Sequence, residues 1–386
     1  MKKANKPILL GFGVVILSFG FQNCSDVEFK TTSSLCAEGE VCTNSLPGGK
    51  CFEQTYTQPS TVTENQALDI LMVTDTSGSL ADERRQVAEG MSLLLQQLPE
   101  SANINMSVML AHGDRSSYGG KLFAKRSSDI VFRAQNKTRQ QVSNYILENL
   151  ASSLPADNDT DGGEVLLYSL YSSLFNNYLS IQSQGFYRQD TNLVVIMITD
   201  ENDICSLGSY PRPERATPVY DPEQREDDAY QKYCVDSSGR AIVTPMAIKN
   251  GFADIKSNAQ VYVHSISYLD PDLVPNRGEN EIGYGVIDLV DQMGGVKVDM
   301  GRATNDKDHI PRALAKIGEL TQKQLGYLKT QFDLSATDQV DQQSVRVFVD
   351  GKPIYNFEFN SSLQAVKLSS AGSAGSVIQL EYCSLD

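Results

Sequence analysis

Two kinds of apolar pattern alternate along the middle of the chain. Nearly continuous apolar runs, such as Leu68–Val73 and Leu193–Ile198, are typical of strands that are buried on both faces. Between them, as in Leu80–Leu98, apolar residues recur every three or four positions, which is typical of a helix with one buried side. The alternation predicts an α/β fold, with a doubly wound, mainly parallel, Rossmann-like sheet and helices on both faces.

The same patterns predict the further elements of this domain. Leu122–Phe132 is expected to be a β segment at an antiparallel edge of the sheet. The other expected strands are Ile104–Leu110, Gln260–Ser267 and Val296–Met300, and the other expected helices are Thr138–Leu150, Val165–Leu179, Pro245–Lys256, Val286–Met293 and Ile310–Gln324. We assign residues 67–325 to this α/β domain.

Beyond residue 325 the pattern changes to short, β-prone segments separated by turn signals such as Asp350-Gly351. We assign 326–386 to a small, all-β C-terminal appendage. About sixty residues form a marginal core alone, so packing on the α/β domain and a disulfide at Cys383 are expected to support it. The expected strands are Gln331–Leu334, Ser344–Val349, Tyr355–Phe359, Gln364–Leu368 and Val377–Tyr382.

The first residues read as a targeting segment. Three lysines precede the apolar run Ile8–Gly20, which is too short for a typical membrane span and suits the core of a signal peptide. Cys24 follows where cleavage is expected, and this arrangement resembles a bacterial lipoprotein signal in which that cysteine is lipidated. The resemblance implies a signal peptide at 1–23, a polar tether at 24–66 and a membrane-anchored protein. Ser25 after the cysteine implies sorting to the outer membrane, although Asn23 replaces the usual small residue before it.

The cysteine count is consistent with export. The chain has seven cysteines, and lipidation of Cys24 leaves an even number, which suggests three disulfides in an exported chain. Cys205 and Cys234 lie in one segment and are expected to pair. The other four are free to pair in three ways, each of which ties Cys383 to the N-terminal region: they are Cys36, Cys42, Cys51 and Cys383.

The charge argues against some partners. The net charge is −15, and it becomes −18 once three lysines leave with the signal peptide. An acidic chain of this kind is not expected to bind nucleic acid or anionic lipid through bulk charge. The membrane is therefore expected to be reached through the lipid anchor.

Oxygen-bearing side chains follow the first buried strand directly. Asp75, Ser77 and Ser79 come at spacing two in the turn before the next helix. Ligands bind at strand ends in open α/β sheets, and a carboxylate with two hydroxyls supplies half of a site for a hard cation. The alternative is that Asp75 and Ser77 merely cap the helix that follows.

Two further segments complete a pattern with this turn. The strand Val194–Ile198 leads to Asp200, and the acidic loop Asp157–Glu164 lies between the two strands in sequence. In this order, a D-x-S-x-S strand end, a threonine loop and a T-D strand end resemble a von Willebrand factor A (VWA) domain with a metal-ion-dependent adhesion site. The resemblance covers roughly residues 68–324.

The VWA resemblance implies a set of metal ligands and a mode of binding. The ligands would be Asp75, Ser77, Ser79, Thr160 and Asp200, with Asp161 or Glu164 as alternatives to the threonine. In that family the hydroxyls tend to bind the metal directly and the aspartates act largely through water. Mg²⁺, or Ca²⁺ or Mn²⁺, would be the cofactor, and an acidic group of a protein partner would complete the octahedron.

The acidic loop permits another interpretation. Asp157, Asp159, Asp161 and Gly162 fit the first half of a calcium-binding loop, and with Glu164 they are candidates for an additional metal site. The bidentate glutamate expected at the twelfth position is absent, because residue 168 is tyrosine. A solvated acidic turn that caps a helix is the remaining alternative.

A long insertion, 201–240, follows Asp200. It contains four prolines and the expected Cys205–Cys234 bridge, which argue against disorder. Because it leaves the sheet beside the metal ligands, it is expected to form part of a partner-binding surface. An inert covering segment is the alternative.

These observations favour a lipid-anchored cell-envelope protein that binds a carboxylate-bearing protein partner through a divalent cation, in adhesion or surface recognition. The first alternative is a periplasmic structural or assembly protein whose metal site is vestigial or only stabilising. A metal-assisted hydrolase is the second. We expect no enzymatic activity, because the chain has three histidines and lacks a nucleophile elbow, a phosphate-binding loop and an H-E-x-x-H motif.

Overall fold

A computed structural model describes most of the chain. The described residues are 29–30, 50–60, 67–99, 102–135, 137–151, 153–160, 162–206, 222–256, 259–275, 280–335, 339–361, 364–370 and 372–385. Cys24, Cys36, Cys42 and Asp161 lie outside them, as do the signal peptide and most of the tether. Within the described part, none of the helices combines the length and apolar character that crossing a bilayer requires.

The α/β domain is built on a sheet in the order β5-β4-β3-β7-β8-β9, in which β6 also pairs with β4. The strands from β4 to β9 are parallel, and β5 and β6 are antiparallel to β4. A mixed α/β fold with a mostly parallel central sheet is therefore present, as the apolar runs predicted. The strands are β3 (Ala67–Thr74), β4 (Asn103–Leu110), β5 (Leu122–Phe123), β6 (Phe132–Arg133), β7 (Asn192–Ile198), β8 (Val261–Ser267) and β9 (Lys297–Asp299).

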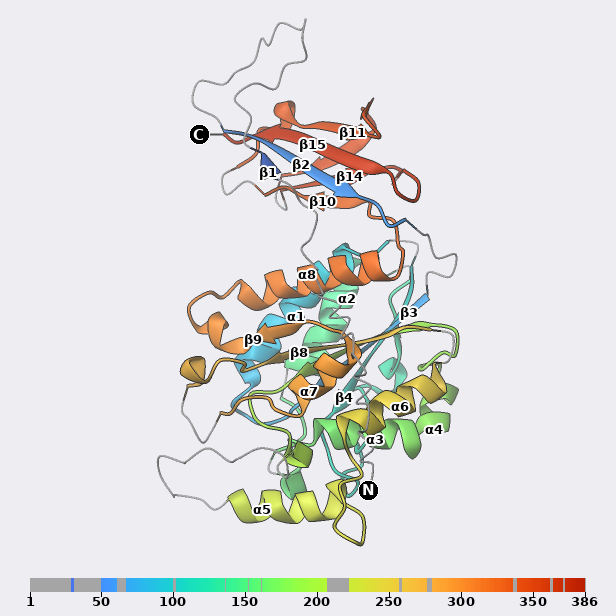
Figure 1. The fold of residues 1–386 in the computed structure, drawn as a ribbon, viewed down its shortest axis with the longest axis vertical. Coiled ribbons are helices and arrows are strands. Elements are labelled where there is room, and N and C mark those ends of the chain that lie inside the picture. Colours follow the sequence, from blue (N-terminus) through green and yellow to red (C-terminus); the bar gives the residue numbers. More distant parts are fainter. Residues whose placement is uncertain are drawn as a thin grey trace, which may run out of the picture.

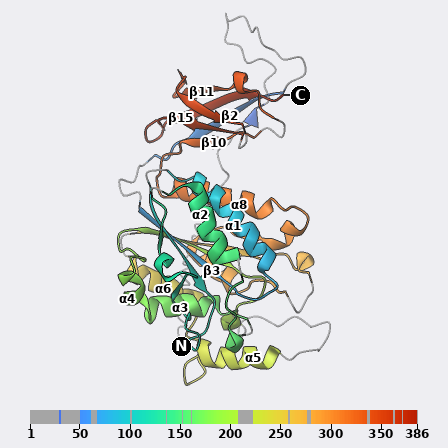
Figure 2. The same ribbon diagram turned by 180° about the vertical axis from the view of Figure 1, so that it is seen from behind.

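Helices cover both faces of this sheet (Figures 1 and 2). One face packs on α1 (Ala81–Gln96), α2 (Arg139–Ile146) and α8 (His309–Gln324). The other packs on α3 (Leu166–Phe175), α4 (Tyr178–Ser183), α6 (Pro245–Ile255) and α7 (Val286–Met293).

Strand β3 shows how one run of sequence serves both layers. Ile70 and Met72 belong to the core under α1 and α8, whereas Leu71 and Val73 belong to the core under α3. All four are fully buried. Successive strand side chains point to opposite faces, so a strand between two helical layers must be apolar at nearly every position.

Two segments depart from the sequence analysis in detail. The β segment expected over Leu122–Phe132 is divided into β5 and β6, and both pair with β4. The single helix expected over Val165–Leu179 is divided into α3 and α4 around Asn176 and Asn177. Asparagine side chains hydrogen-bond nearby backbone and favour helix ends, and the Asn177 side-chain amide donates to the Ser172 carbonyl at 3.4 Å.

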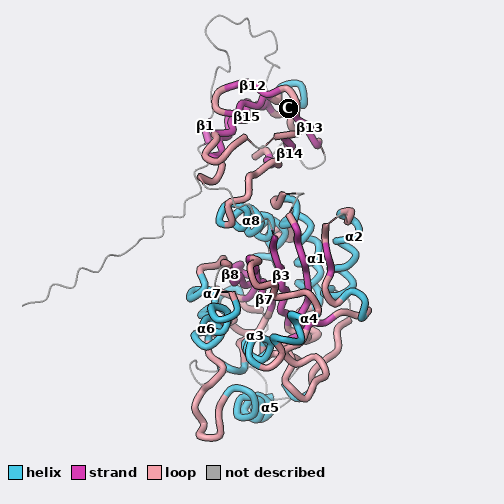
Figure 3. Tube along the Cα trace, turned by 90° about the vertical axis from the view of Figure 1, so that its right-hand side faces the viewer, coloured by secondary structure: helices cyan, strands magenta, loops and turns pink. Residues whose placement is uncertain are grey.

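Residues beyond 325, together with β1 and β2 from the N-terminal part of the chain, form two antiparallel sheets, which lie beyond α8 at one end of the molecule (Figures 1 and 3). Their orders are β1-β2-β15-β11-β12 and β10-β14-β13. The strands are β1 (Phe29–Lys30), β2 (Cys51–Thr57), β10 (Gln331–Asp333), β11 (Arg346–Val349), β12 (Lys352–Ile354), β13 (Phe357–Asn360), β14 (Ala365–Leu368) and β15 (Val377–Cys383). We call this unit the β-module.

The tether assigned to 24–66 needs a correction, because part of it is a strand of the β-module. All seven residues of β2 pair with β15, from Cys51 opposite Cys383 to Thr57 opposite Val377. Tyr56 joins the buried core of the module, and Phe52 packs against that core. Phe52 and Tyr56 lie on the same side of β2, but Gln54 lies between them, so the sequence shows no clear strand pattern here.

Gln58 lies where the chain leaves the β-module after β2, and Lys329 lies where the chain returns to the module before β10. The Gln58 side-chain amide donates to the Lys329 carbonyl at 2.7 Å and accepts from its N–H at 2.9 Å. The buried Lys329 ammonium lies 3.5 Å from the Glu319 carboxylate of α8 and 5.0 Å from the centre of the Tyr56 ring. These contacts link the β-module to the helical layer.

Candidate metal centre

The ends of β3 and β7 bring the first and last predicted ligands to one edge of the sheet. Thr74 lies opposite Ile198 in the parallel register, and the Asp75 N–H donates to the Ile198 carbonyl at 3.0 Å. Asp75 and Asp200 therefore follow adjacent strands at the same edge, where ligands bind in open α/β sheets.

The turn after β3 is tightly hydrogen-bonded. The buried Asp75 carboxylate accepts from the Ser77 N–H at 2.6 Å and from the Thr199 hydroxyl at 3.4 Å. The Ser77 and Ser79 hydroxyl oxygens lie 3.0 Å apart at the exposed rim of the turn. Asp75 therefore closes the turn itself, and α1, whose N-cap is Leu80, has no side-chain cap, so the alternative that Asp75 and Ser77 cap this helix is wrong.

Arg84 of α1 stabilises the turn through hydrogen bonds to two of its carbonyls. Its buried guanidinium donates to the carbonyls of Asp75 at 3.1 Å and Ser77 at 2.9 Å. Burial lowers the pKa of this guanidinium, while the charges of Asp75, Asp200 and Glu83 oppose that change. Arg84 was not predicted as a site residue, because its place on a helix gives no sign that it turns back to the strand end.

The carboxylates at this edge are electrostatically crowded. Burial raises the pKa of Asp75, and burial together with the charge of Asp75 raises the pKa of Asp200. Burial also raises the pKa of Glu201, which is hydrogen-bonded to Glu164 and lies near both aspartates. A bound cation would favour the charged forms of all these groups. Glu201 was missed in the sequence analysis, although its position directly after Asp200 was a usable signal.

One buried carboxylate oxygen at this edge has no hydrogen-bond partner among the described residues. It is Oδ1 of Asp200, a residue that is 2 % exposed. A carboxylate oxygen in that position costs free energy unless a donor or a cation satisfies it. The described residues contain no group of three histidine, cysteine or carboxylate side chains suited to hold a metal, so a cation here would also need the serine hydroxyls. That donor set, made of hydroxyls and a few carboxylates, fits a hard divalent cation.

The acidic loop lies against the D-x-S-x-S turn. A Cβ added to Gly162 would lie 3.4 Å from the Ser77 Cβ, and the Thr76 hydroxyl donates to the Gly162 carbonyl. Gly163 has a φ of +114°, and a Cβ there would lie 2.4 Å from the Thr76 oxygen. The loop can approach the turn this closely because residue 163 is a glycine, and the φ of +110° at Gly162 also favours glycine there.

Within the loop, Thr160 is held by an internal hydrogen bond. Its fully buried hydroxyl donates to Asp157 Oδ2 at 3.0 Å, and the same oxygen accepts from the Gly113 N–H at 2.8 Å. The other oxygen of Asp157 accepts from the Asp159 N–H at 3.2 Å. Asp157 therefore acts as a cap within the turn, and its Oδ2 already accepts two hydrogen bonds.

Asp159 has basic partners. Its Oδ2 lies 3.0 Å from the Lys232 ammonium and 3.6 Å from the Arg115 guanidinium. The hydrogen bond from Lys232 lowers the pKa of Asp159. This ion pair joins the acidic loop to the long insertion, a contact that spacing alone does not reveal.

Two disulfides lie within the described residues. Cys205 is bonded to Cys234, as the sequence predicted. Cys51 is bonded to Cys383, which is one of the partners left open for the C-terminal cysteine. The predicted partners Cys36 and Cys42, and the lipidation site Cys24, lie outside the described residues.

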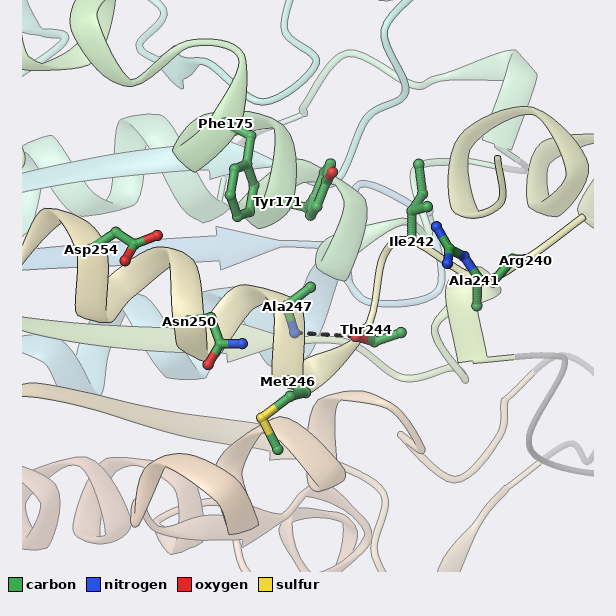
Figure 4. Close-up of a pocket in the computed structure, with 10 residues that line it drawn as sticks. All are labelled: Tyr171, Phe175, Arg240, Ala241, Ile242, Thr244, Met246, Ala247, Asn250 and Asp254. Carbon is green, nitrogen blue, oxygen red and sulfur yellow. Dashed lines mark hydrogen bonds between the residues drawn. The ribbon is translucent and has the colours of Figure 1, made fainter. Parts of the chain in front are cut away.

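A separate groove lies between α3, α6 and the residues that end the insertion (Figure 4). Its volume is about 470 Å³, and Phe175 and Met246 on its walls are 48 % and 52 % exposed. Arg240 lies at one end, and its guanidinium pairs with Asp236 at 3.3 Å. None of the predicted metal ligands lines this groove.

Comparisons with known proteins do not establish a family. No protein-family model and no curated protein matches the chain. Among solved structures, it is similar to a von Willebrand factor type A protein from Catenulispora acidiphila, with 10% identity, a TM-score of 0.34, and 87% of this chain and 60% of that chain covered. It is also similar to the open form of the pilus adhesin SpaC from Lactobacillus rhamnosus GG, with 16% identity, a TM-score of 0.36, and 95% and 43% covered.

A third similar structure is the adhesive tip pilin from Group B Streptococcus agalactiae, with 11% identity, a TM-score of 0.29, and 92% of this chain and 84% of that chain covered. The chain spans less than two thirds of the first two proteins. Scores at this level define neither the family nor the function of the chain. The class that the fold itself defines is a doubly wound α/β domain with an oxygen-rich edge, joined to a β-module.

Proposed function

We propose that this chain binds a divalent cation at the ends of β3 and β7 and, through that cation, a carboxylate of a protein partner. The observation that carries the proposal is the buried Oδ1 of Asp200, which has no hydrogen-bond partner among the described residues and lies at the same edge as the paired hydroxyls of Ser77 and Ser79. The partially exposed hydroxyls lie on the solvent side, and the buried carboxylates lie beneath them.

In this proposal some residues contact the cation directly and others act through bound water. Ser77 and Ser79 contact Mg²⁺, Ca²⁺ or Mn²⁺ directly, and Asp75 and Asp200 supply negative charge and orient bound water. Thr160 serves from the acidic loop, because a hydroxyl that donates to Asp157 keeps its oxygen lone pairs for a cation, and Glu164 is the alternative on that loop. When bound, the cation supplies an electrophilic position for an external carboxylate.

The role proposed for the whole protein is recognition at the cell envelope without catalysis. Cys24 would carry the lipid anchor, and the outer membrane is the proposed location. The described part of the insertion lies beside the acidic loop, so it would border the partner's carboxylate. Protease treatment of intact cells distinguishes a surface position from a periplasmic one, because only a surface-exposed chain is cut.

Metal titration of the full-length chain tests the proposal. Calorimetry with Mg²⁺, Ca²⁺ and Mn²⁺ is expected to show one saturable site, and Ser77→Ala and Asp200→Asn are expected to weaken it at least roughly tenfold. Ser92→Ala is the matched control, because the Ser92 hydroxyl bonds the Glu89 carbonyl on the exposed side of α1. A wild-type chain that shows no saturable binding of any of the three cations would falsify the proposal.

The contact between Glu164 and Glu201 supports a second candidate, a cation site that only stabilises the fold. An internal carboxylate would then occupy the position proposed for the partner. Proton relaxation of water around bound Mn²⁺ separates the two candidates. An open position exchanges water and loses that signal when acetate is added, whereas an internally filled position does not respond to acetate.

A further inference from the structure

Two short segments of the insertion clamp the loop that carries Thr160. They are η4 (Ile204–Ser206) and η5 (Tyr230–Cys234), and the Cys205–Cys234 disulfide joins them. We refer to these two segments as the disulfide clamp. We propose that Lys232 and Tyr233 of the clamp are positioning residues for the metal site, which act through the acidic loop. This inference rests on the metal site proposed above and adds residues outside its ligand set.

The clamp holds the acidic loop near both of its ends. The Ile204 N–H donates to the Glu164 carbonyl at 3.1 Å, next to the end of the loop. At the other end, Asp159 Oδ2 lies 3.0 Å from the Lys232 ammonium and accepts from the Tyr233 hydroxyl at 3.4 Å. Because Cys205 and Cys234 are bonded, these two attachments belong to one covalently closed unit. Their combined effect is to restrict the movement of Thr160 between them.

Tyr233 also supports Thr160 through packing. A Cβ added to Gly113 would lie 2.4 Å from the Tyr233 ring, so the ring lies directly on the Gly113 backbone. The Gly113 N–H donates to Asp157 Oδ2, and the Thr160 hydroxyl donates to that same oxygen. Tyr233 is 3 % exposed and packs at a tilt against Tyr168, with ring centres 4.9 Å apart. A contiguous set of contacts therefore runs from the clamp to the threonine.

An electrostatic effect alone predicts that replacing Lys232 strengthens metal binding, whereas a positioning role predicts that it weakens metal binding. The Lys232 ammonium is a positive charge near an acidic site, so removal of that charge should tighten the binding of a cation. The same holds if Asp159 is itself a metal ligand, because Lys232 would then compete with the metal. Positioning predicts weaker binding after the same substitution, because the loop loses its attachment. The sign of the change in affinity thus distinguishes the two explanations.

The experiment compares Lys232→Met with Arg115→Met in the full-length chain. Both substitutions remove one positive charge near Asp159, since Arg115 lies 3.6 Å from the same oxygen but outside the clamp. Titration with Mg²⁺ and Mn²⁺ is expected to show about a fivefold higher Kd for Lys232→Met. Arg115→Met is expected to bind with the same or a lower Kd. Melting in the presence of chelator shows whether each variant is folded.

Hydrogen exchange supplies a second readout that needs no metal. The Gly162 N–H donates to the Asp157 carbonyl, and the N–H groups of Gly163 and Glu164 donate to the Thr160 carbonyl. These three amides are expected to exchange faster in Lys232→Met than in Arg115→Met, both measured with chelator present. Unchanged exchange, or equal or tighter metal binding by Lys232→Met, overturns the inference. If the wild type binds no metal, the proposed function fails, while the exchange data still decide whether the clamp positions the loop.

Discussion

Acid should destabilise this protein through one buried histidine. His264 lies in the middle of β8 and is 1 % exposed. Its Nδ1 accepts a hydrogen bond from the Val296 N–H at 2.9 Å, and burial lowers its pKa from 6.5 to about 4. The folded chain therefore holds a neutral imidazole, and a proton on Nδ1 would have to displace the Val296 N–H.

The size of the effect follows from the difference in proton binding. Below pH 6.5 the unfolded chain takes up a proton on His264, whereas the folded chain does not until the pH approaches about 4. The free energy of unfolding therefore falls as the pH is lowered through this range. The loss between pH 7 and pH 5 is about 2 kcal/mol, and the full loss is about 3 kcal/mol.

Urea unfolding at pH 7 and pH 5 measures this contribution when the wild type is compared with His264→Asn. Asparagine keeps an acceptor near the Val296 N–H and does not titrate, so the carboxylates contribute equally to both proteins. The chain has no tryptophan, which makes circular dichroism the suitable probe. The wild type should lose about 2 kcal/mol more than the variant. Equal losses in the two proteins would refute the argument that a buried neutral imidazole controls this step.

Three other predictions concern the core and the proposed metal site. Ile70→Ala should lower the free energy of unfolding by about 2–5 kcal/mol in urea titrations, because Ile70 is fully buried under α1 and α8. Gly163→Ala should weaken Mg²⁺ binding in calorimetry, because its Cβ would meet the Thr76 oxygen. Gly239→Ala is the control, because Gly239 also has a positive φ (+78°) but has open space around it. Equal affinities of the two variants for Mg²⁺ would contradict this prediction. The Kd for Mg²⁺ should rise as the pH falls from 8 to 6. Burial raises the pKa values of Asp75 and Asp200, so protons compete with the cation in this range. A Kd that does not change with pH would contradict this prediction.

The central sheet was predictable because burial on both faces leaves a strong local signal. Strands β3 and β7 are apolar at almost every position, and parallel strands must end at the same edge, so the approach of Asp75 to Asp200 followed from the order of elements. Long-range pairing leaves no such signal. Cys51 lies opposite Cys383 across a separation of 332 residues, and no local pattern identifies β15 as the partner of β2.

The surroundings of the candidate site were less predictable than its proposed ligands. Lys232 and Asp159 are ordinary surface residue types, and their contact depends on how the insertion folds back over 73 positions. Arg84 reaches the carbonyls of the strand end from the first turns of α1, a contact that depends on side-chain direction. Such supporting contacts depend on tertiary packing, whereas each of the three parts of the motif can be read from a short stretch of sequence.

The Cys51–Cys383 bond has a mechanical consequence. It connects the first residue of β2 to the last residue of β15, and the whole α/β domain lies in the covalent loop between them. Tension between the segment before Cys51 and the segment after Cys383 would pass through this one sulfur–sulfur linkage. Under such a load the sheet edge that carries Asp75 and Asp200 would bear no force and would keep its geometry while the flanking segments are stretched.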